Sequence, residues 1–203
     1  MKTKFLHIAT ALLFAGFTSS CSDFLDRYPL DELSDSSFWK TENDAMMAVT
    51  DIYGCLPTWD QDEDINSDNA VHGIKWAAGN ISKGIYDPMD QSWAGSYTPI
   101  RQCNLVLEKV KDIEMSDESR KKIEGQAYFF RAFVYFNLIR SFGDVPYIDK
   151  PLNLTDVEDI TRTPREEVYA KVMADFDKAI EYLPEEWDAA NTPRVTKGAA
   201  LAM

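Results

Sequence analysis

The stretch from Ser116 to Phe142 constrains the fold most, because it predicts a single long helix that is apolar on two sides. Ser116 can cap this helix and Gly143 can end it. One set of apolar residues at helical spacing is Ile123, Ala127, Phe130, Val134 and Leu138. A second set is Tyr128, Ala132, Tyr135, Ile139 and Phe142. A helix that is apolar on two sides must pack against neighbours on two sides, so we predict the interior helix of a stack.

Two shorter helices are expected before it. Thr41 is an N-cap candidate with Asp44 in the capping-box position, and Gly54 marks the end of that helix. Helical spacing resumes near Tyr97 and fades around Asp112. The intervening residues show no sustained period, so they predict a long irregular segment.

A further helix is expected after the long one. Residues 163–166 read Thr-Pro-Arg-Glu, which predicts a capping box with proline at the first helical position. Phe176, Ala179 and Pro184 match the second helix of a tetratricopeptide repeat, although Val172 stands where that repeat prefers alanine. The sequence therefore predicts an all-α, tetratricopeptide-like helical solenoid with long irregular loops.

The chain ends within another apolar helical pattern. Residues 194–203 begin a helix that has only about two turns in which to find a packing partner. We therefore expect the helical domain to be incomplete at its C-terminus.

The first twenty residues have the order of a secretory signal peptide. Lys2 and Lys4 precede the apolar run 5–17, and small residues 18–20 lead to Cys21. The run is shorter than the roughly 20 residues that a membrane-spanning helix needs. A cysteine at this place is typical of a bacterial lipoprotein, although Thr18 and Ser20 depart from the usual box. Lipidation of Cys21 is the favoured interpretation, and plain secretion or a membrane-spanning anchor are the alternatives.

The charge balance excludes one class of partner. The formal net charge is −13, and loss of residues 1–20 would remove two lysines and no acid. Nucleic-acid phosphates require clustered Lys and Arg, so we expect no nucleic acid to bind. Cys55 and Cys103 remain after the anchor, and free thiols are favoured over a disulfide between them.

The irregular segment 55–92 carries the candidate ligand residues. A long stretch without regular structure is more often functional than idle in a compact domain. Aromatic rings stack on the flat faces of sugars, and polar side chains bind their hydroxyls. The candidates are Trp59, Trp76, Tyr86, Asn66, Asp68, Asn69 and Asn80. Packing of these rings onto the helices is the alternative, and it is favoured outright for Trp93.

Other candidate sites have weaker support. Arg101 could reach a ligand, whereas Arg131 is expected to be structural, because most arginines beside an apolar helix face snorkel or pair with an acid. The alternating acids of 60–68 match neither register of an EF-hand, so a solvated acidic loop is expected rather than calcium. His72 has no Cys–His or Ser–His constellation around it. We therefore predict no catalytic residue, no metal site and no cofactor.

Four stretches in order resemble the SusD/RagB nutrient-binding lipoproteins. The first is Cys21 to Asp26 with Pro29 and Phe38-Trp39, and the second is Trp93, Tyr97, Ile100, Asn104 and Leu107. The most specific runs from Gln126 to Ala132 and on to Pro146. The last covers Arg162 to Pro184 and then Arg194 to Ala200. The resemblance covers nearly all of the chain after residue 20.

The resemblance implies a signal peptide at 1–20 and a SusD-like N-terminal helical domain at 21–203. It further implies a lipid anchor on the outer membrane and partnership with a SusC-like TonB-dependent transporter. The expected function is capture of an oligosaccharide or another nutrient at the cell surface, without enzymatic activity. Alternatives are peptide capture on the same scaffold, a glycosidase, or a scaffold that binds nothing.

Overall fold

The computed structural model describes residues 38–56 and 93–203, and Trp39–Met203 form one compact unit. The helices in chain order are α3 (Glu42–Ile52), η2 (Tyr53–Cys55), α4 (Trp93–Lys109), η6 (Val110–Asp112), α5 (Asp117–Phe142), η7 (Leu154–Val157), α6 (Arg165–Tyr182) and α7 (Lys197–Ala202). Over the described ranges there is no strand, only an isolated antiparallel bridge between Val145 and Thr163. The prediction of an all-α fold is confirmed.

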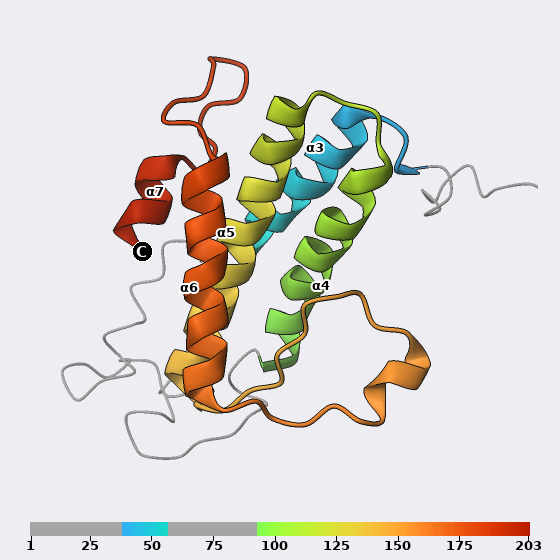
Figure 1. Cartoon of the computed structure of the whole chain (residues 1–203), viewed down its shortest axis with the longest axis vertical. Helices are drawn as coiled ribbons and strands as arrows, with labels where there is room; N and C mark the ends of the chain where they lie inside the picture. The colour runs from blue at the N-terminus through green and yellow to red at the C-terminus, as the bar shows by residue number, and fades with distance from the viewer. Residues whose placement is uncertain (1–37, 57–92) are drawn as a thin grey trace, which may run out of the picture. The chain divides into compact units, whose positions relative to one another are not determined.

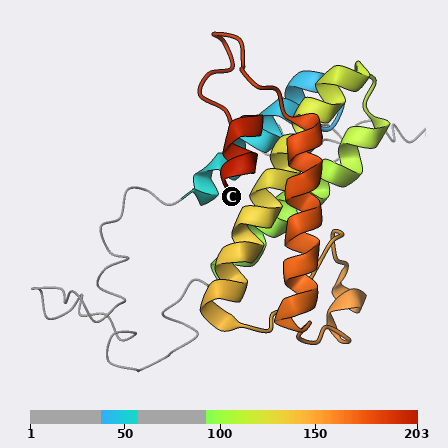
Figure 2. The same ribbon diagram turned by 60° about the vertical axis from the view of Figure 1, so that its left-hand side comes forward.

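Helix α5 is the interior helix of the stack, as predicted. It packs against α4 and α3 on one side and against α6 on the other. Figures 1 and 2 show α4, α5 and α6 side by side, with successive helices running in opposite directions. All five residues of the first apolar set are buried, and so are the three middle residues of the second. Burial on both flanks explains why two apolar stripes are needed on one helix.

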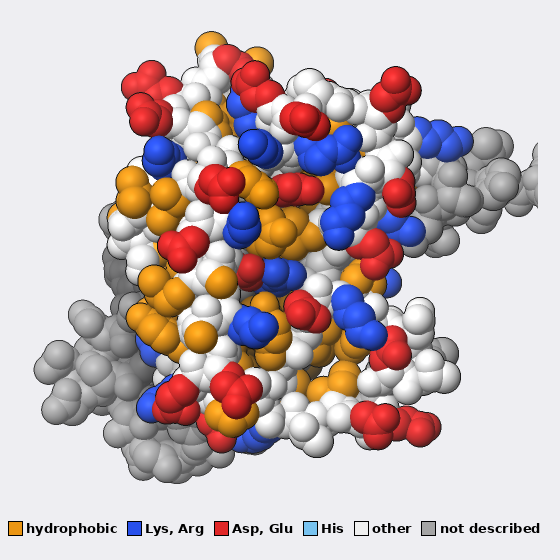
Figure 3. All heavy atoms as spheres, in the orientation of Figure 1, with side chains coloured by type: hydrophobic (Ala, Val, Ile, Leu, Met, Phe, Trp, Pro, Cys, Tyr) orange, Lys and Arg blue, Asp and Glu red, His pale blue; other side chains and the backbone are white. Residues whose placement is uncertain are grey.

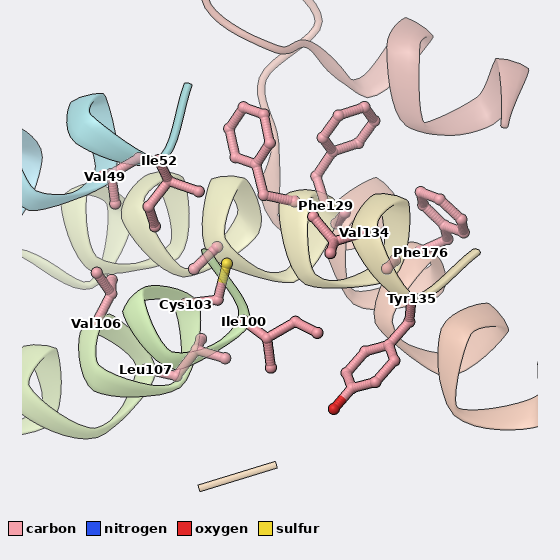
Figure 4. Close-up of a cluster of buried hydrophobic side chains, with 14 of the residues drawn as sticks. Val49, Ile52, Ile100, Cys103, Val106, Leu107, Phe129, Val134, Tyr135 and Phe176 are labelled. Atoms are coloured by element: carbon pink, nitrogen blue, oxygen red, sulfur yellow. The ribbon is translucent and has the colours of Figure 1, made fainter. Parts of the chain in front are cut away.

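The core lies where α3, α4, α5 and α6 meet (Figure 4). Phe130 and Tyr135 of α5 are the largest fully buried side chains. Phe129 stacks edge-on against both Phe130 and Phe176, which joins α5 to α6. Full burial of one such side chain contributes about 1.5–3 kcal/mol to stability. The core therefore fixes the relative positions of the helices that carry the site.

Three of the predicted helix ends are confirmed by their hydrogen bonds. The Thr41 hydroxyl accepts from the backbone N–H of Asp44, and the Asp44 carboxylate accepts from the backbone N–H of Thr41. The Ser116 hydroxyl accepts from the backbone N–H of Ser119. Gly143 ends α5 with φ of 71°, a value that favours glycine.

The predicted capping box before α6 is wrong. Helix α6 begins at Arg165, and the Thr163 hydroxyl instead accepts from the backbone N–H of Tyr147. The Arg165 N–H donates to the carboxylate of Asp144, 2.9 Å away. Thr163 pairs its backbone with Val145, which brings Asp144 to the start of α6. A cap from 21 residues upstream therefore replaces the local one.

Helix α4 begins at Trp93, four residues before Tyr97. The predicted packing role of Trp93 is confirmed, because its ring lies edge-on to Phe142 at 4.9 Å between centroids. The guanidinium of Arg162 lies 5.3 Å from the centre of the same ring. Trp93 thus ties the start of α4 to the end of α5.

Hydrogen bonds tie the segment before α7 to α3 and α5. The Tyr53 hydroxyl donates to the Gln126 side chain at 2.8 Å and accepts from the backbone N–H of Val195 at 2.9 Å. Arg194 donates to the same Gln126 oxygen and to the hydroxyl of Thr50. Residues that lie more than 140 positions apart are thereby joined.

Cys55 and Cys103 are both free thiols, which agrees with the favoured interpretation. Burial raises the pKa of Cys55 to about 11 and raises that of the fully buried Cys103 further. Separately, no helix within 38–56 or 93–203 combines the length and apolarity required to cross a membrane.

Candidate functional site

A cleft of about 380 Å³ opens between α4, α5 and α6. The segment that follows α5 forms its remaining wall. The lining side chains are Asn104, Leu107, Glu108, Lys111, Tyr128, Arg131, Tyr147, Asp149, Lys150, Pro151, Lys171, Ala174 and Asp175. Its volume falls within the range of small-molecule sites. We call it the polar cleft.

An ion pair between α5 and α6 forms part of the polar cleft. Arg131 donates to both carboxylate oxygens of Asp175, each at 2.7 Å, and to the side-chain oxygen of Asn104 at 2.8 Å. All three residues are buried, with exposed fractions of 6% or less. Arg131 was expected to be structural, and of the two roles left open for it the structure shows pairing with an acid. Three helices therefore share one charged hydrogen-bond network.

The pKa values of this pair reflect its burial. Burial raises the pKa of Asp175 above its ordinary value, although the hydrogen bonds from Arg131 act in the opposite direction. Burial alone would lower the pKa of Arg131, but the bonds and charge of Asp175 raise it instead. The guanidinium therefore stays charged, and Asp175 accepts two of its four hydrogen bonds.

The wall after α5 is held by hydrogen bonds to the helices. The Tyr135 hydroxyl accepts from the backbone N–H of Ile148 at 2.7 Å and donates to the carbonyl of Ile148 at 3.1 Å. The Asn104 amide donates to the carbonyls of Ile148 and Lys150. Tyr147 and Lys150 therefore project from a fixed backbone.

The rim of the polar cleft carries exposed charges of both signs. The amines are those of Lys111 near the end of α4, Lys171 of α6 and Lys150 of the wall. The carboxylates are those of Glu108 and Asp149. Figure 3 shows basic and acidic side chains interleaved over the strip between α6 and α4. This mixture differs from a uniformly acidic surface, although the whole chain is acidic.

A second cleft of about 140 Å³ lies beside the first half of α4. It is lined by Tyr97, Ile100, Arg101, Ile148, Lys150 and Leu152. Lys150 lines both clefts, so they are adjacent. Arg101 is exposed, and it is the one predicted ligand residue that lies in the described part of the chain.

The other predicted ligand residues lie outside the described ranges. They are Trp59, Trp76, Tyr86, Asn66, Asp68, Asn69 and Asn80. The lipidation candidate Cys21 and the acids of 60–68 lie outside them as well. Within residues 38–56 and 93–203, no group of three or more His, Cys, Asp or Glu side chains is arranged to hold a metal ion.

The family is decided by a match over residues 23–203. The matching family model is SusD-like and is described as starch-binding, associating with the outer membrane. The chain belongs to the SusD-like family. The resemblance seen in the sequence is thereby confirmed.

Individual relatives of this chain support its assignment to the SusD-like family. The SusD-like protein P2 of Formosa agariphila is 30% identical over 217 residues, which cover 99% of this chain and 42% of that protein. The crystal structure of a SusD-like protein from Bacteroides fragilis has 27% identity and a TM-score of 0.71. It is matched over 87% of this chain and 36% of its own.

A SusD-like carbohydrate binding protein of the same species has 26% identity and a TM-score of 0.67. That match covers 81% of this chain and 36% of the other. The SusD-like chain described here thus spans about two-fifths of the length of its relatives. These neighbours confirm the tetratricopeptide-like helical fold.

Sequence reasoning missed the polar cleft. No motif or spacing in the sequence marks Lys111, Lys150, Lys171 or Tyr147 as residues of a site. Outward lysines usually mark a solvated face, so nothing local distinguishes these. One available signal was the position of Tyr147, which directly follows Pro146 just beyond the end of the long helix.

Proposed function

We propose that this SusD-like protein captures glycans at the cell surface and delivers them to a SusC-like TonB-dependent transporter. The match of residues 23–203 to a starch-binding, outer-membrane family is the observation that carries the proposal. Capture involves no chemical change in the ligand, so the proposed role is binding and not catalysis.

The helical stack suits this role because it is rigid. Helix α5 is buried on two flanks, and the Arg131–Asp175 pair joins it to α6. A surface that is already ordered loses less conformational entropy on binding. The stack therefore supplies a preorganised support for residues that touch the ligand.

The ligand contacts that we propose come from two places. Trp59, Trp76 and Tyr86 would stack on sugar rings, with Asn66, Asp68, Asn69 and Asn80 as hydrogen-bonding partners. Their segment leads directly into α4, whose first turns carry Tyr97 and Arg101 beside the smaller cleft. Arg101 would therefore bind the same ligand as the segment that precedes α4.

Calorimetry with the purified protein tests glycan capture. We expect starch oligosaccharides to bind, and we expect Trp59→Ala and Trp76→Ala each to weaken this binding by roughly ten-fold, a loss of about 1–1.5 kcal/mol. Tyr169→Ala is the matched control, because Tyr169 is an exposed aromatic residue of α6 outside both clefts. Binding of peptides but no glycan would favour peptide capture, and release of reducing ends would favour a glycosidase.

The anchor and the transporter have separate tests. Radiolabelled palmitate should enter the protein in cells and should be lost in Cys21→Ala, whereas Cys55→Ala keeps the label. A SusC-like transporter encoded beside this gene should co-purify with the wild-type protein. Labelling that is independent of Cys21 contradicts the anchor, and failure of co-purification in mild detergent contradicts delivery to the transporter.

A further inference from the structure

The polar cleft holds two phenol hydroxyls that have no hydrogen-bond partner among the described residues. The hydroxyls of Tyr128 and Tyr147 form no hydrogen bond with any residue in the described part of the chain, and both rings are half-buried. Each phenol can donate one hydrogen bond and accept another. A ligand in the cleft could satisfy both.

Two of the charged side chains in the polar cleft form an ion pair with each other, and the others form no ion pair within the described residues. Arg131 and Asp175 form the ion pair, in which Arg131 donates one hydrogen bond to each carboxylate oxygen of Asp175. The amines of Lys111, Lys150 and Lys171 and the carboxylates of Glu108 and Asp149 make no ion pair among the described residues. These three amines and two carboxylates leave the polar cleft with an excess of one positive charge, although the formal net charge of the whole chain is −13.

This set of groups selects for a particular ligand chemistry. The amines attract one negatively charged group, whereas the two carboxylates disfavour a ligand of high negative charge. Carboxylates accept hydrogen bonds from hydroxyls, and the phenols can bind hydroxyls as well. A ligand with one anionic group and several hydroxyls therefore matches the cleft better than a compact anion does.

Apolar surfaces of the cleft suit the same ligand. The rings of Tyr128 and Tyr147 line the cleft together with the apolar side chains of Leu107 and Pro151. Aromatic rings provide flat apolar contact to the face of a sugar ring. Because Tyr135 and Asn104 hold the backbone of the wall, the position of Tyr147 is set before a ligand arrives.

We infer that the polar cleft is a binding site for an acidic saccharide, in which a uronic acid carboxylate meets the lysines while its hydroxyls meet Glu108, Asp149 and the two phenols. This inference rests on the proposed function and narrows it, because it names the chemistry of a ligand unit. It also gives the protein a second subsite, outside the irregular segment 55–92.

Calorimetry with acidic disaccharides tests the inference. The probes are disaccharides that contain one galacturonate or one mannuronate unit, each compared with its neutral methyl ester. Hydrogen bonds between an ammonium group and a carboxylate are stronger than those to a neutral ester, so the acid should bind roughly ten-fold more tightly than its ester. The double variant Lys111→Gln/Lys171→Gln should remove this preference.

Two further variants separate a binding effect from a folding effect. Lys178→Gln removes an exposed amine of α6 that lies outside the cleft, so the preference for the acid should stay unchanged. Tyr147→Phe removes a hydroxyl that has no hydrogen-bond partner among the described residues. It should therefore weaken the binding of the acidic disaccharides while leaving the unfolding midpoint unchanged.

Some results would overturn the inference and leave glycan capture intact. Equal affinity for acid and ester does so, and so does full affinity in Lys111→Gln/Lys171→Gln or failure of both acids to bind. In each case, the proposed function stands if neutral glycans still bind and if their binding still requires Trp59 and Trp76. Conversely, uronate binding that depends on the lysines but not on those tryptophans supports the cleft and counts against the aromatic segment.

Discussion

Arg131 on α5 and Asp175 on α6 form a bidentate ion pair inside the helical stack, with both nitrogen–oxygen distances at 2.7 Å. Their side chains are 7% and 8% exposed, so water does little to screen them. The side-chain oxygen of Asn104 accepts a further hydrogen bond from the same guanidinium. The pair joins the two helices and lines the polar cleft.

Removing one partner of this pair should be costly. Asp175→Leu leaves a buried guanidinium without its counter-charge, and we expect a loss of about 3–5 kcal/mol in the free energy of unfolding. Arg131→Met/Asp175→Leu should recover most of that loss, since no unpaired charge remains buried. Urea denaturation followed by circular dichroism measures both. If Asp175→Leu is no less stable than Lys178→Gln, which breaks an exposed pair, the interaction has little structural importance.

The carboxylate of Asp144 should stabilise the start of α6. Asp144→Ala removes the acceptor for the Arg165 N–H, and loss of such a cap costs about 1 kcal/mol. Asp144→Asn keeps a side-chain acceptor and should retain most of the stability. Urea midpoints of the three proteins compare them directly, and equal midpoints for Ala and Asp at this position would refute the capping role.

Two helical glycines should respond oppositely to alanine. A Cβ on Gly125 would lie 3.0 Å from Cβ of Tyr182 and 3.1 Å from Cγ of Leu183, so α5 and α6 would have to separate. Overpacking of this kind costs about 1–3 kcal/mol, which exceeds the gain of about 1 kcal/mol in helix propensity.

Gly198→Ala provides the matched control. Its new Cβ would have only the Thr196 hydroxyl within 4 Å, at an ordinary contact distance of 3.6 Å. We expect Gly125→Ala to lower the thermal midpoint and Gly198→Ala to leave it unchanged or raise it. An unchanged midpoint in Gly125→Ala would mean that the two helices separate at no cost.

Stability should fall in alkaline solution. Burial raises the pKa of Tyr97 and of Tyr147 to about 12, against an ordinary value of 10. The unfolded chain therefore releases these protons first, so their contribution is complete below pH 10 and is lost as the pH rises towards 12.

Urea midpoints at pH 8, 10 and 11 measure this loss. Tyr147→Phe should reduce the slope above pH 10, whereas Tyr169→Phe, which changes an exposed residue, should keep the wild-type slope. A slope that is identical in wild type and Tyr147→Phe would show that Tyr147 does not contribute.

Some of this architecture could be predicted from local sequence alone. Apolar spacing over 117–142 identified a helix buried on two flanks, because a period of 3.6 residues places those side chains on two stripes. Thr41, Ser116 and Gly143 marked helix ends correctly, since their partners lie within four residues. The ligand residues proposed for the irregular segment 55–92 remain predictions.

What only the tertiary structure decided is which distant residues meet. Thr163 looked like a cap, yet Asp144 takes that role because the bridge between Val145 and Thr163 delivers its carboxylate. Arg131 was expected to snorkel or to pair with an acid, but only helix packing selects Asp175 among 34 acids. The polar cleft likewise draws on three helices and a connecting segment, because hydrogen bonding and charge act through space and leave no periodic pattern in the chain.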